Sequence, residues 1–353
     1  MNHSGRITWR SPSNIALVKY WGKRPGQLPA NPSLSMTLER AHTITSLAFA
    51  PFESAKPGSI QLDFWFDGEK NEKFKEKIHK YLLSRLDDYP ILSGYALEIH
   101  SSNTFPHSTG IASSASGMSA FCLCLSGFLV TVGKLRSDPH GFYREASRLS
   151  RLASGSACRS VYGGFTVWGE HELVNGSSDE YAVPLETRLH HTFRDIRDAI
   201  LVVSSREKSV TSRAGHSLMD NHPFAMQRYQ MARQNLTGLL ESMKDGDMEK
   251  FADITEMEAM VLHGLMMSSS PSYFLFEPNT VNIVKAVRQY RKDSGIPVCF
   301  TLDAGPNVHL LYPGQKEEKV KDWIQNELLA YCQDGVWIDD RMGKGPEELK
   351  DEK

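Results

Sequence analysis

The segment from Ile99 to Gly133 contains no Asp, Glu, Lys or Arg, and it constrains the fold more than any other feature. Its first half is rich in Ser, Gly, Thr and Asn and is interrupted by Pro106. Its second half holds the apolar run from Phe121 to Val132. This run is too short to span a bilayer, which takes about 20 residues in a helix. We therefore expect a loop followed by a buried helix, and no membrane span.

The composition is that of a globular chain. Its 353 residues are 40% hydrophobic and 23% charged, which excludes an intrinsically disordered protein and allows two lobes with separate cores. The formal net charge of -2 argues against a general nucleic-acid binder. Five cysteines without a CxxC pair favour neither a disulfide framework nor a structural zinc site. Residues 1–10 lack the apolar core of a signal peptide, so we expect a cytoplasmic protein.

Local patterns predict a mixed α and β fold. Runs of β-branched and aromatic residues predict strands at residues 15–20, 42–49, 60–66, 95–100, 161–168, 199–204, 298–302 and 308–312. Helical spacing of apolar residues predicts helices at 74–86, 138–152, 223–243, 248–266, 279–292 and 317–331. A polar stretch at 187–198 indicates the lobe boundary. We expect one lobe over 1–190, a second over 191–340, and a charged, mobile tail over 341–353.

The segment from Pro106 to Gly117 is rich in small residues and directly precedes the apolar helix. Small residues let the backbone approach a ligand closely, and the free N–H groups at a helix start attract anions. The hydroxyls of Ser113, Ser114 and Ser116 could donate to phosphate oxygens. There is no GxxxxGK[ST] sequence, so a Walker A loop is not supported. Composition alone equally allows a Ser/Gly linker into a packed helix.

Two further segments carry cations at selected positions. Lys19 ends an apolar strand and Lys23 follows Tyr-Trp-Gly, so each lysine either extends to solvent or faces an anionic ligand. In the sequence Ser-Gly-Ser-Ala-Cys-Arg-Ser, Arg159 lies among hydroxyls. This arrangement suits bidentate binding of a carboxylate or phosphate, although a helix end with a solvated arginine fits equally well. Cys158 is more typical of a packed small residue than of a nucleophile.

Asp303 lies at the end of an apolar strand and is followed by Ala-Gly-Pro-Asn. Taken alone, it is more typical of a turn residue that bonds its own backbone. The alternative is a carboxylate directed into a cleft, where it could accept a proton.

Together with Val-Thr-Ser-Arg at 210–213, these segments resemble the diphosphomevalonate decarboxylase family of the GHMP kinase superfamily. The matching motifs occur in the family's order from residue 13 to residue 307, and Lys-Tyr-Trp-Gly-Lys and Ser-Gly-Ser-Ala-Cys-Arg are the most specific. The resemblance implies an α+β fold of two lobes with the active site in the cleft between them. The N-terminal lobe would be like domain 2 of ribosomal protein S5, and the C-terminal lobe would be ferredoxin-like.

The resemblance also implies an activity and a set of site residues. The activity is ATP-dependent decarboxylation of mevalonate 5-diphosphate to isopentenyl diphosphate, through a 3-phosphorylated intermediate, in the mevalonate route of isoprenoid and lipid biosynthesis. The implied catalytic residues are Asp303, Lys19 and Arg159. The implied substrate-binding residues are Tyr20, Lys23, Ser154, Ser156, Arg159, Ser212 and Arg213. The implied ATP-binding residues are Gly110, Ala112, Ser113, Ser114, Ser116 and Gly117. Mg2+ would be bound with the nucleotide and not by protein ligands, and a homodimer is expected.

Three alternatives stay open at this point. The chain could be a related enzyme that acts on mevalonate phosphate, a kinase that does not decarboxylate, or a non-catalytic protein that binds nucleotides or isoprenoid precursors. Lys19 together with Asp303 argues against the non-catalytic alternative, and Arg159 favours a substrate with a carboxylate.

One departure from the family pattern concerns the phosphate loop. His107, Ser108 and Thr109 replace residues that the family often carries there, which puts nucleotide affinity or choice in question. A concentrated phosphate site is still compatible with the near-zero net charge. Residues 1–50 hold a local excess of basic residues, and we expect a cationic cleft to which Arg148, Arg151, Arg159 and Arg213 contribute.

Overall fold

The computed structural model describes the chain except for residues 1–2, 53–57, 106–112, 187–188, 207–209 and 351–353. The side chains of Ser113, Ser212 and Arg213 also lie outside the description. Gly110 and Ala112 of the predicted phosphate loop, and the variant residues His107, Ser108 and Thr109, fall within these gaps.

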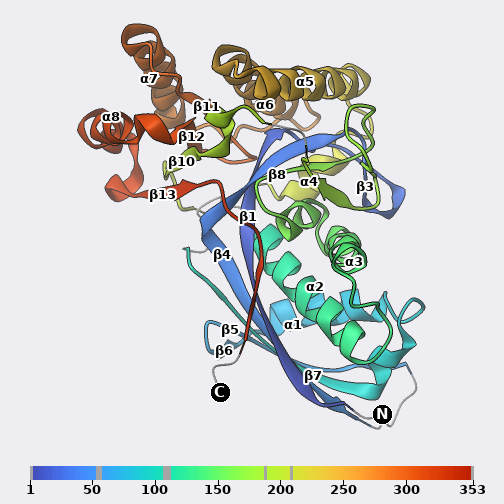
Figure 1. Cartoon of the computed structure of the whole chain (residues 1–353). Coiled ribbons are helices and arrows are strands. Elements are labelled where there is room, and N and C mark those ends of the chain that lie inside the picture. Colours follow the sequence, from blue (N-terminus) through green and yellow to red (C-terminus); the bar gives the residue numbers. More distant parts are fainter. Residues whose placement is uncertain (1–2, 53–57, 106–112, 187–188, 207–209, 351–353) are drawn as a thin grey trace.

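The first lobe is built on an eight-stranded sheet with two long central strands (Figure 1). β1 (Gly5–Val18) pairs antiparallel with β4 (Ser33–Pro51), and the order across the sheet is β14-β1-β4-β7-β5-β6. β7 (Tyr95–Asn103) is antiparallel to β4 and parallel to β5 (Gln61–Phe66). The remaining strands are short: β6 (Glu69–Lys70), β8 (Phe165–Trp168), which pairs with β4, and β9 (Ala182–Pro184).

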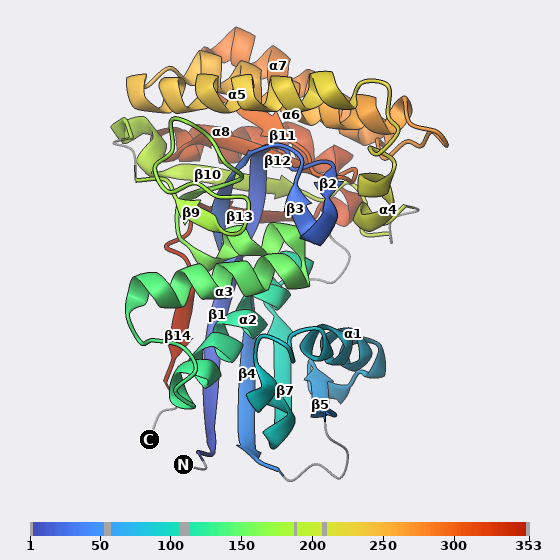
Figure 2. The ribbon, with the colours of Figure 1, turned by 90° about the vertical axis from the view of Figure 1, so that its right-hand side faces the viewer.

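Three helices pack in the first lobe: α1 (Glu72–Leu83), α2 (Ser113–Thr131) and α3 (Pro139–Ala153). Asn71 and Asp138 cap α1 and α3 by accepting backbone N–H groups, as short polar side chains do at helix starts. α2 is long and apolar enough to cross a membrane by length and composition, but 72% of the window from Ser114 to Thr131 is buried inside the protein. Its position is that of the central core helix, in agreement with the predicted buried helix (Figure 2).

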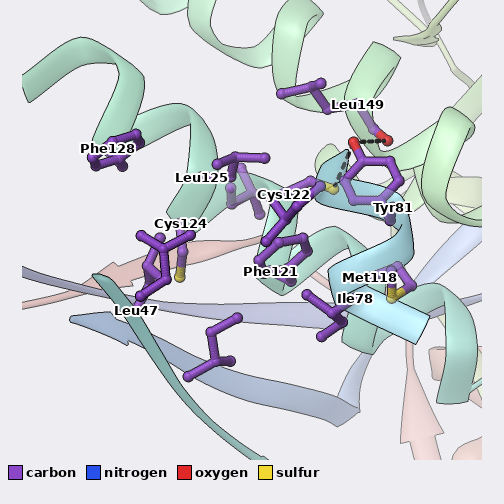
Figure 3. Close-up of a cluster of buried hydrophobic side chains, with 14 of the residues drawn as sticks. Leu47, Ile78, Tyr81, Met118, Phe121, Cys122, Cys124, Leu125, Phe128 and Leu149 are labelled. Atoms are coloured by element: carbon purple, nitrogen blue, oxygen red, sulfur yellow. Dashed lines mark hydrogen bonds between the residues drawn. The ribbon is translucent and has the colours of Figure 1, made fainter. Parts of the chain in front are cut away.

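The core around α2 is closely packed (Figure 3). Phe121, Leu125 and Phe128 of α2 are fully buried with Leu47 of β4. The Tyr81 hydroxyl of α1 donates to the Leu149 carbonyl of α3 at 3.0 Å, and a buried hydroxyl needs such a partner. All five cysteines of the chain are buried and free.

The second lobe has a four-stranded antiparallel sheet in the order β11-β12-β10-β13. Its strands are β10 (Ile196–Leu201), β11 (Cys299–Thr301), β12 (Val308–Pro313) and β13 (Trp337–Arg341). Four longer helices belong to this lobe: α5 (Ala225–Asp245), α6 (Met248–Met267), α7 (Pro278–Ser294) and α8 (Glu317–Trp323). Gly246, with φ of 85°, ends α5, and Asp247 caps α6, so two residues reverse the chain between the predicted pair of long helices.

The two lobes share one apolar cluster, which fixes their relative position. Ile15 of β1 and Leu34 of β4 belong to the same cluster as Ile200 and Leu311 of the second sheet and Phe251 of α6. Burial of this much apolar surface favours a single arrangement of the lobes. The junction also holds α4 (Ser212–Ser217) and a hairpin of β2 (Lys23–Arg24) and β3 (Leu28–Pro29).

The expectation of a mobile tail is wrong for most of its length. After β13 the chain returns to the first lobe, where β14 (Glu347–Leu349) pairs with β1 between Thr8 and Arg10. Figures 1 and 2 show this strand along the edge of the large sheet. The backbone accounts for the error, because unpaired N–H and C=O groups of an edge strand can bind a tail of any composition. The limits of 1–190 and 191–340 stay a prediction.

Candidate active site

The centre of the site is a contact between Lys19 and Asp303, which are 284 positions apart in the chain. Lys19 directly follows β1, and Asp303 follows β11. The Lys19 Nζ donates to Asp303 Oδ1 at 2.9 Å and to the Ala16 carbonyl at 2.6 Å. The Thr301 hydroxyl also donates to the Ala16 carbonyl, so the ends of the two strands are joined. The sequence allowed either a turn role or a ligand-facing role for Asp303, and its contact with Lys19 places it where the two lobes meet.

Burial and charge act in opposite directions on this pair. The Lys19 side chain is 2% exposed and that of Asp303 is 30% exposed. Burial lowers the pKa of Lys19, and the Asp303 carboxylate opposes this effect. The carboxylate is therefore the group open to a ligand, while the ammonium lies behind it.

Arg159 lies near this pair on the short helix η3 (Gly155–Val161). The guanidinium is buried and donates from Nη1 to the Ser33 hydroxyl at 2.8 Å, and its buried Nε has no partner in the part of the chain that the structure describes. Burial lowers the pKa of Arg159, and the nearby Asp303 carboxylate opposes the shift. A buried arginine with spare donors is suited to an anionic ligand.

Tyr20 connects this arginine to the Ser154–Ser156 turn. Its ring lies between Trp168, at 4.5 Å, and His216, at 4.4 Å between centroids. Its hydroxyl is buried, has no hydrogen-bond partner within the described ranges, and lies so close to Gly155 that a Cβ there would be 2.9 Å away. Burial raises the pKa of Tyr20, so the phenol stays neutral and able to donate. Ser154 and Ser156 are half-buried on either side of Gly155.

The segment that contains Lys23 and the segment at 210–213, which were both predicted to bind an anion, also meet here. The Gly22 N–H donates to His216 Nδ1 of α4 at 3.0 Å, so α4 lies against the turn that precedes Lys23. Ser212 and Arg213 begin the same helix. Lys23 itself donates to Gln27 Oε1 at 2.8 Å.

Sequence reasoning missed His216. Its ring is buried and lies 4.6 Å from the Trp21 ring. Burial, together with the charges of Lys23 and Arg159, lowers the pKa of His216 to about 3. The histidine is thus a neutral acceptor for the Gly22 N–H. No spacing or charge pattern in the chain points to it, since its partner is a backbone group of the other lobe.

The predicted phosphate loop is described only from the start of α2. Ser114 is exposed and Gly117 is half-buried near this start. Ser116 is fully buried, with its Oγ 2.7 Å from Thr43 Oγ1 of β4. Its hydroxyl is thus directed at the sheet and is poorly placed for a phosphate, which differs from the prediction.

A pocket with a volume of about 90 Å³ opens beside this helix start. The sequence did not indicate it, because its lining comes from three strands and two helices. The lining is mainly apolar and aromatic with a few polar groups: Thr43, Thr45, Phe64, Phe66, Phe74, Lys77, Ile78, Ser101, Asn103, Ser114, Gly117, Met118 and Phe121. Such a combination is typical of small-molecule sites.

Two arginines expected in the cationic cleft are engaged elsewhere. Arg148 pairs with Glu145 at 2.8 Å and approaches Asp88 at 3.6 Å. Arg151 binds Glu180 at 2.5 Å and donates to the Gly26 carbonyl. Because each guanidinium is compensated by a local acceptor, neither adds free charge to the cleft. Within the described residues, no three His, Cys, Asp or Glu side chains cluster as a metal site.

The two sheets, the apolar helix α2 and the polar site between the lobes define a protein of the GHMP kinase fold. The chain matches the diphosphomevalonate decarboxylase-like N-terminal domain over residues 11–182, and the mevalonate 5-diphosphate decarboxylase C-terminal domain over residues 199–345.

Individual relatives agree with these matches. The diphosphomevalonate decarboxylase of Debaryomyces hansenii is 31% identical over 88% of this chain and 80% of that protein. The mevalonate diphosphate decarboxylase from Staphylococcus aureus is 31% identical with a TM-score of 0.82 over 99% of each chain. A chain named MDDEF, solved in complex with MVAPP, AMPPCP and magnesium, is 28% identical with a TM-score of 0.82 over 99% of this chain and 100% of its own. The protein described here belongs to the diphosphomevalonate decarboxylase family, and the predicted family and fold class are confirmed.

Proposed function

We propose that this chain catalyses the ATP-dependent decarboxylation of mevalonate 5-diphosphate to isopentenyl diphosphate, with ADP, phosphate and carbon dioxide as the other products. The observation that carries the proposal is the 2.9 Å contact between Lys19 and Asp303, with buried Arg159 nearby. This arrangement offers a base, a cation for a transferring phosphoryl group and a cation for a carboxylate. Phosphoryl transfer depends mainly on such positioning and charge compensation.

Asp303 is proposed as the base for the 3-hydroxyl of the substrate. The carboxylate is the more exposed partner of the pair, and the adjacent ammonium favours its ionised form. Accepting the hydroxyl proton would allow the oxygen to attack the γ-phosphate of ATP. Lys19 would stabilise charge on the transferring group, an interaction of about 4 kcal/mol at ~4 Å and an effective dielectric constant of ~20.

Arg159 is proposed to hold the substrate carboxylate. Its buried Nε has no hydrogen-bond partner among the described residues, and a guanidinium presents a planar fork that matches a carboxylate. After the 3-phosphate departs, the tertiary carbon carries positive character. Loss of carbon dioxide then supplies the electron pair that forms the double bond, and Arg159 would keep the breaking bond aligned with the empty orbital.

The diphosphate of the substrate and the nucleotide have separate proposed sites. Tyr20, Lys23, Ser154 and Ser156 lie around the junction with α4, and with Ser212 and Arg213 they would hold the diphosphate. ATP would extend from the start of α2 toward the adjacent pocket, whose aromatic lining suits a base. Mg2+ bound with ATP would compensate phosphate charge, and the relative complexed with AMPPCP and magnesium supports this assignment.

The location and assembly are also proposals. We propose a cytoplasmic homodimer that binds neither membranes nor nucleic acids. Five buried free cysteines are compatible with a reducing compartment, and the apolar face of α2 is covered by its own lobe.

The proposed function is tested by incubating the purified protein with Mg-ATP and either mevalonate diphosphate or mevalonate phosphate, while ADP and carbon dioxide are measured together. We expect equal amounts of both products, and only with the diphosphate. ADP without carbon dioxide would indicate a kinase. Turnover of mevalonate phosphate alone would reassign the substrate, and no product with either compound would favour a binding protein.

A further inference from the structure

We propose that helix α6 sets the relative position of Lys19 and Asp303, by holding Lys19 through the buried Glu258–Arg228 pair and Asp303 through His263. The inference rests on the proposed function, in which these two residues act together. Glu258, Arg228 and His263 are positioning residues, since their contacts are with Lys19 and Asp303 and not with reacting atoms.

Both peptide groups of Lys19 are bound by the ion pair of the second lobe. Glu258 Oε2 accepts the Lys19 backbone N–H at 2.8 Å, and Arg228 Nη2 donates to the Lys19 carbonyl at 2.9 Å. The Asn31 side chain also donates to this carbonyl at 3.0 Å. Lys19 directly follows β1, where the sheet no longer fixes the backbone. The contacts from α5 and α6 therefore replace the sheet at this residue.

The pair that makes these contacts is itself rigid. Arg228 of α5 donates to both oxygens of Glu258 at 2.7 Å, and the two side chains are 1% and 0% exposed. Asn235 of α5 donates to Glu258 Oε1 at 2.5 Å. A buried ion pair contributes little net stability, because desolvation offsets the attraction. Its contacts with Lys19 offer a reason for its presence that stability alone does not.

The other member of the catalytic pair is bound by the same helix. His263 Nε2 lies 3.1 Å from the Asp303 carbonyl oxygen. A carbonyl can only accept, so Nε2 carries the proton. The His263 ring stacks on Phe276, at 4.1 Å between centroids and 9° between planes, which restricts its rotation.

Glu258 and His263 are five residues apart on one helix, a rise of about 7.5 Å. Lys19 comes from the first lobe and Asp303 from the second, yet both backbones are attached to this one element. A shift of about 1 Å in such a pair can reduce turnover by roughly a hundredfold. The helix thus acts as a common support for two residues that the sequence separates.

The ion pair also contributes charge at Lys19. The charged groups that act on the ammonium are Asp303, Glu258 and Arg159, while Arg228 binds the Lys19 carbonyl. The Glu258 carboxylate raises the pKa of Lys19 against the effect of burial. Removing that negative charge should lower the pKa further, so the ammonium would be lost at a lower pH than in the wild type.

The decisive comparison is between Glu258→Gln and Glu256→Gln. Glu256 lies on the same helix, is 3% exposed and binds Arg288 at 2.9 Å and Arg291 at 2.5 Å, but it does not contact Lys19 in the described structure. For Glu258→Gln we expect kcat to fall by roughly 10- to 100-fold with KM values close to the wild type, and the alkaline limb of the kcat profile to move to lower pH. For Glu256→Gln we expect both quantities unchanged, whatever its loss in thermal stability. Equal behaviour of the two variants would overturn the proposal.

The His263 contact gives a second test that does not require removal of a buried charge. His263→Gln can still donate to the Asp303 carbonyl, whereas His263→Phe keeps the stacking on Phe276 and loses the donor. We expect His263→Phe to reduce kcat at least tenfold more than His263→Gln at similar KM values. If Glu258→Gln does not fold, this pair decides, and equal kcat values for the two would contradict the proposal. Turnover by the wild type is measured first, since its absence would instead refute the proposed function.

Discussion

At the scale of the residue, Asp303 has the most specific proposed role. Replacing it with Asn keeps the size of the side chain and removes the base. We expect kcat to fall by roughly a hundred- to ten-thousand-fold, while ATP binding changes little, because the proposed nucleotide site lies at α2 and the adjacent pocket. Initial rates and titration calorimetry with ATP measure the two effects. Normal turnover by this variant would remove Asp303 from the base role.

A second prediction concerns Arg159 and the carboxylate of the substrate. In Arg159→Lys the charge is retained but the planar fork is lost, together with the donor to Ser33. Hydrogen bonds to charged groups contribute about 1.5–3 kcal/mol each, so kcat/KM for mevalonate diphosphate should fall by roughly 10- to 100-fold. A wild-type value of kcat/KM would exclude Arg159 from the site.

Residue type alone left the roles of these positions open, and the family motifs chose between the alternatives. Lys19, Arg159 and Asp303 stand out as charges within apolar or small-residue segments, and the motifs ordered them. For Arg151 the same reasoning failed, because its acceptor, Glu180, is 29 positions away. The prediction for Ser116 failed for another reason. Its hydroxyl lies against Thr43, and this direction depends on how α2 is rotated against the sheet.

At the scale of the element, the contact between α4 and the Tyr20–Gly22 turn joins the two segments that are proposed to bind the substrate. In His216→Phe the ring is kept but the acceptor for the Gly22 N–H is lost, which costs about 1–3 kcal/mol for an unpaired buried donor. Asn offers its Oδ1 at the place of Nδ1. We expect His216→Phe to raise the KM for mevalonate diphosphate severalfold with little change for ATP, and His216→Asn to restore part of it. Identical KM values for both variants would contradict this role.

The lowered pKa of His216 predicts that the stability of the protein depends on pH. Its pKa is about 3 when folded and near 6.5 in the unfolded chain. Because the unfolded state binds the proton that the folded state refuses, acid lowers the free energy of unfolding progressively from about pH 6.5 down to about pH 3. His216→Asn should flatten this slope in denaturant titrations across that range. An unchanged slope would mean that the ring is not held neutral by the fold.

Most helices and strands could be predicted from local sequence patterns, whereas the edges of the sheets could not. The helices α5, α6 and α7 lie within a few residues of their predicted limits, because their apolar spacing and caps are local. β1 begins at Gly5, ten residues before its predicted start, since its first half is stabilised by pairing with β4. β14 was missed entirely, because Glu347–Leu349 is charged and becomes a strand only through the free edge of β1.

At the scale of the whole molecule, the function depends on how the lobes meet. Lys19 and Arg159 come from the first lobe and Asp303 from the second, and the shared apolar cluster holds them together. The net charge of -2 gave no sign of this site, because it sums 40 basic and 42 acidic side chains over the whole chain and says nothing of where they lie. The pocket beside α2 was equally hidden, as its lining is assembled only by the packed sheet and helices.

In the proposed mechanism ATP phosphorylates the 3-hydroxyl, and this oxygen then leaves with the phosphate. It is tested most directly with mevalonate diphosphate whose 3-hydroxyl carries a heavy oxygen isotope. After turnover with Mg-ATP, mass spectrometry of the inorganic phosphate should find one labelled oxygen per carbon dioxide released. Label found in water, with unlabelled phosphate, would mean that ATP is hydrolysed separately and would contradict the account.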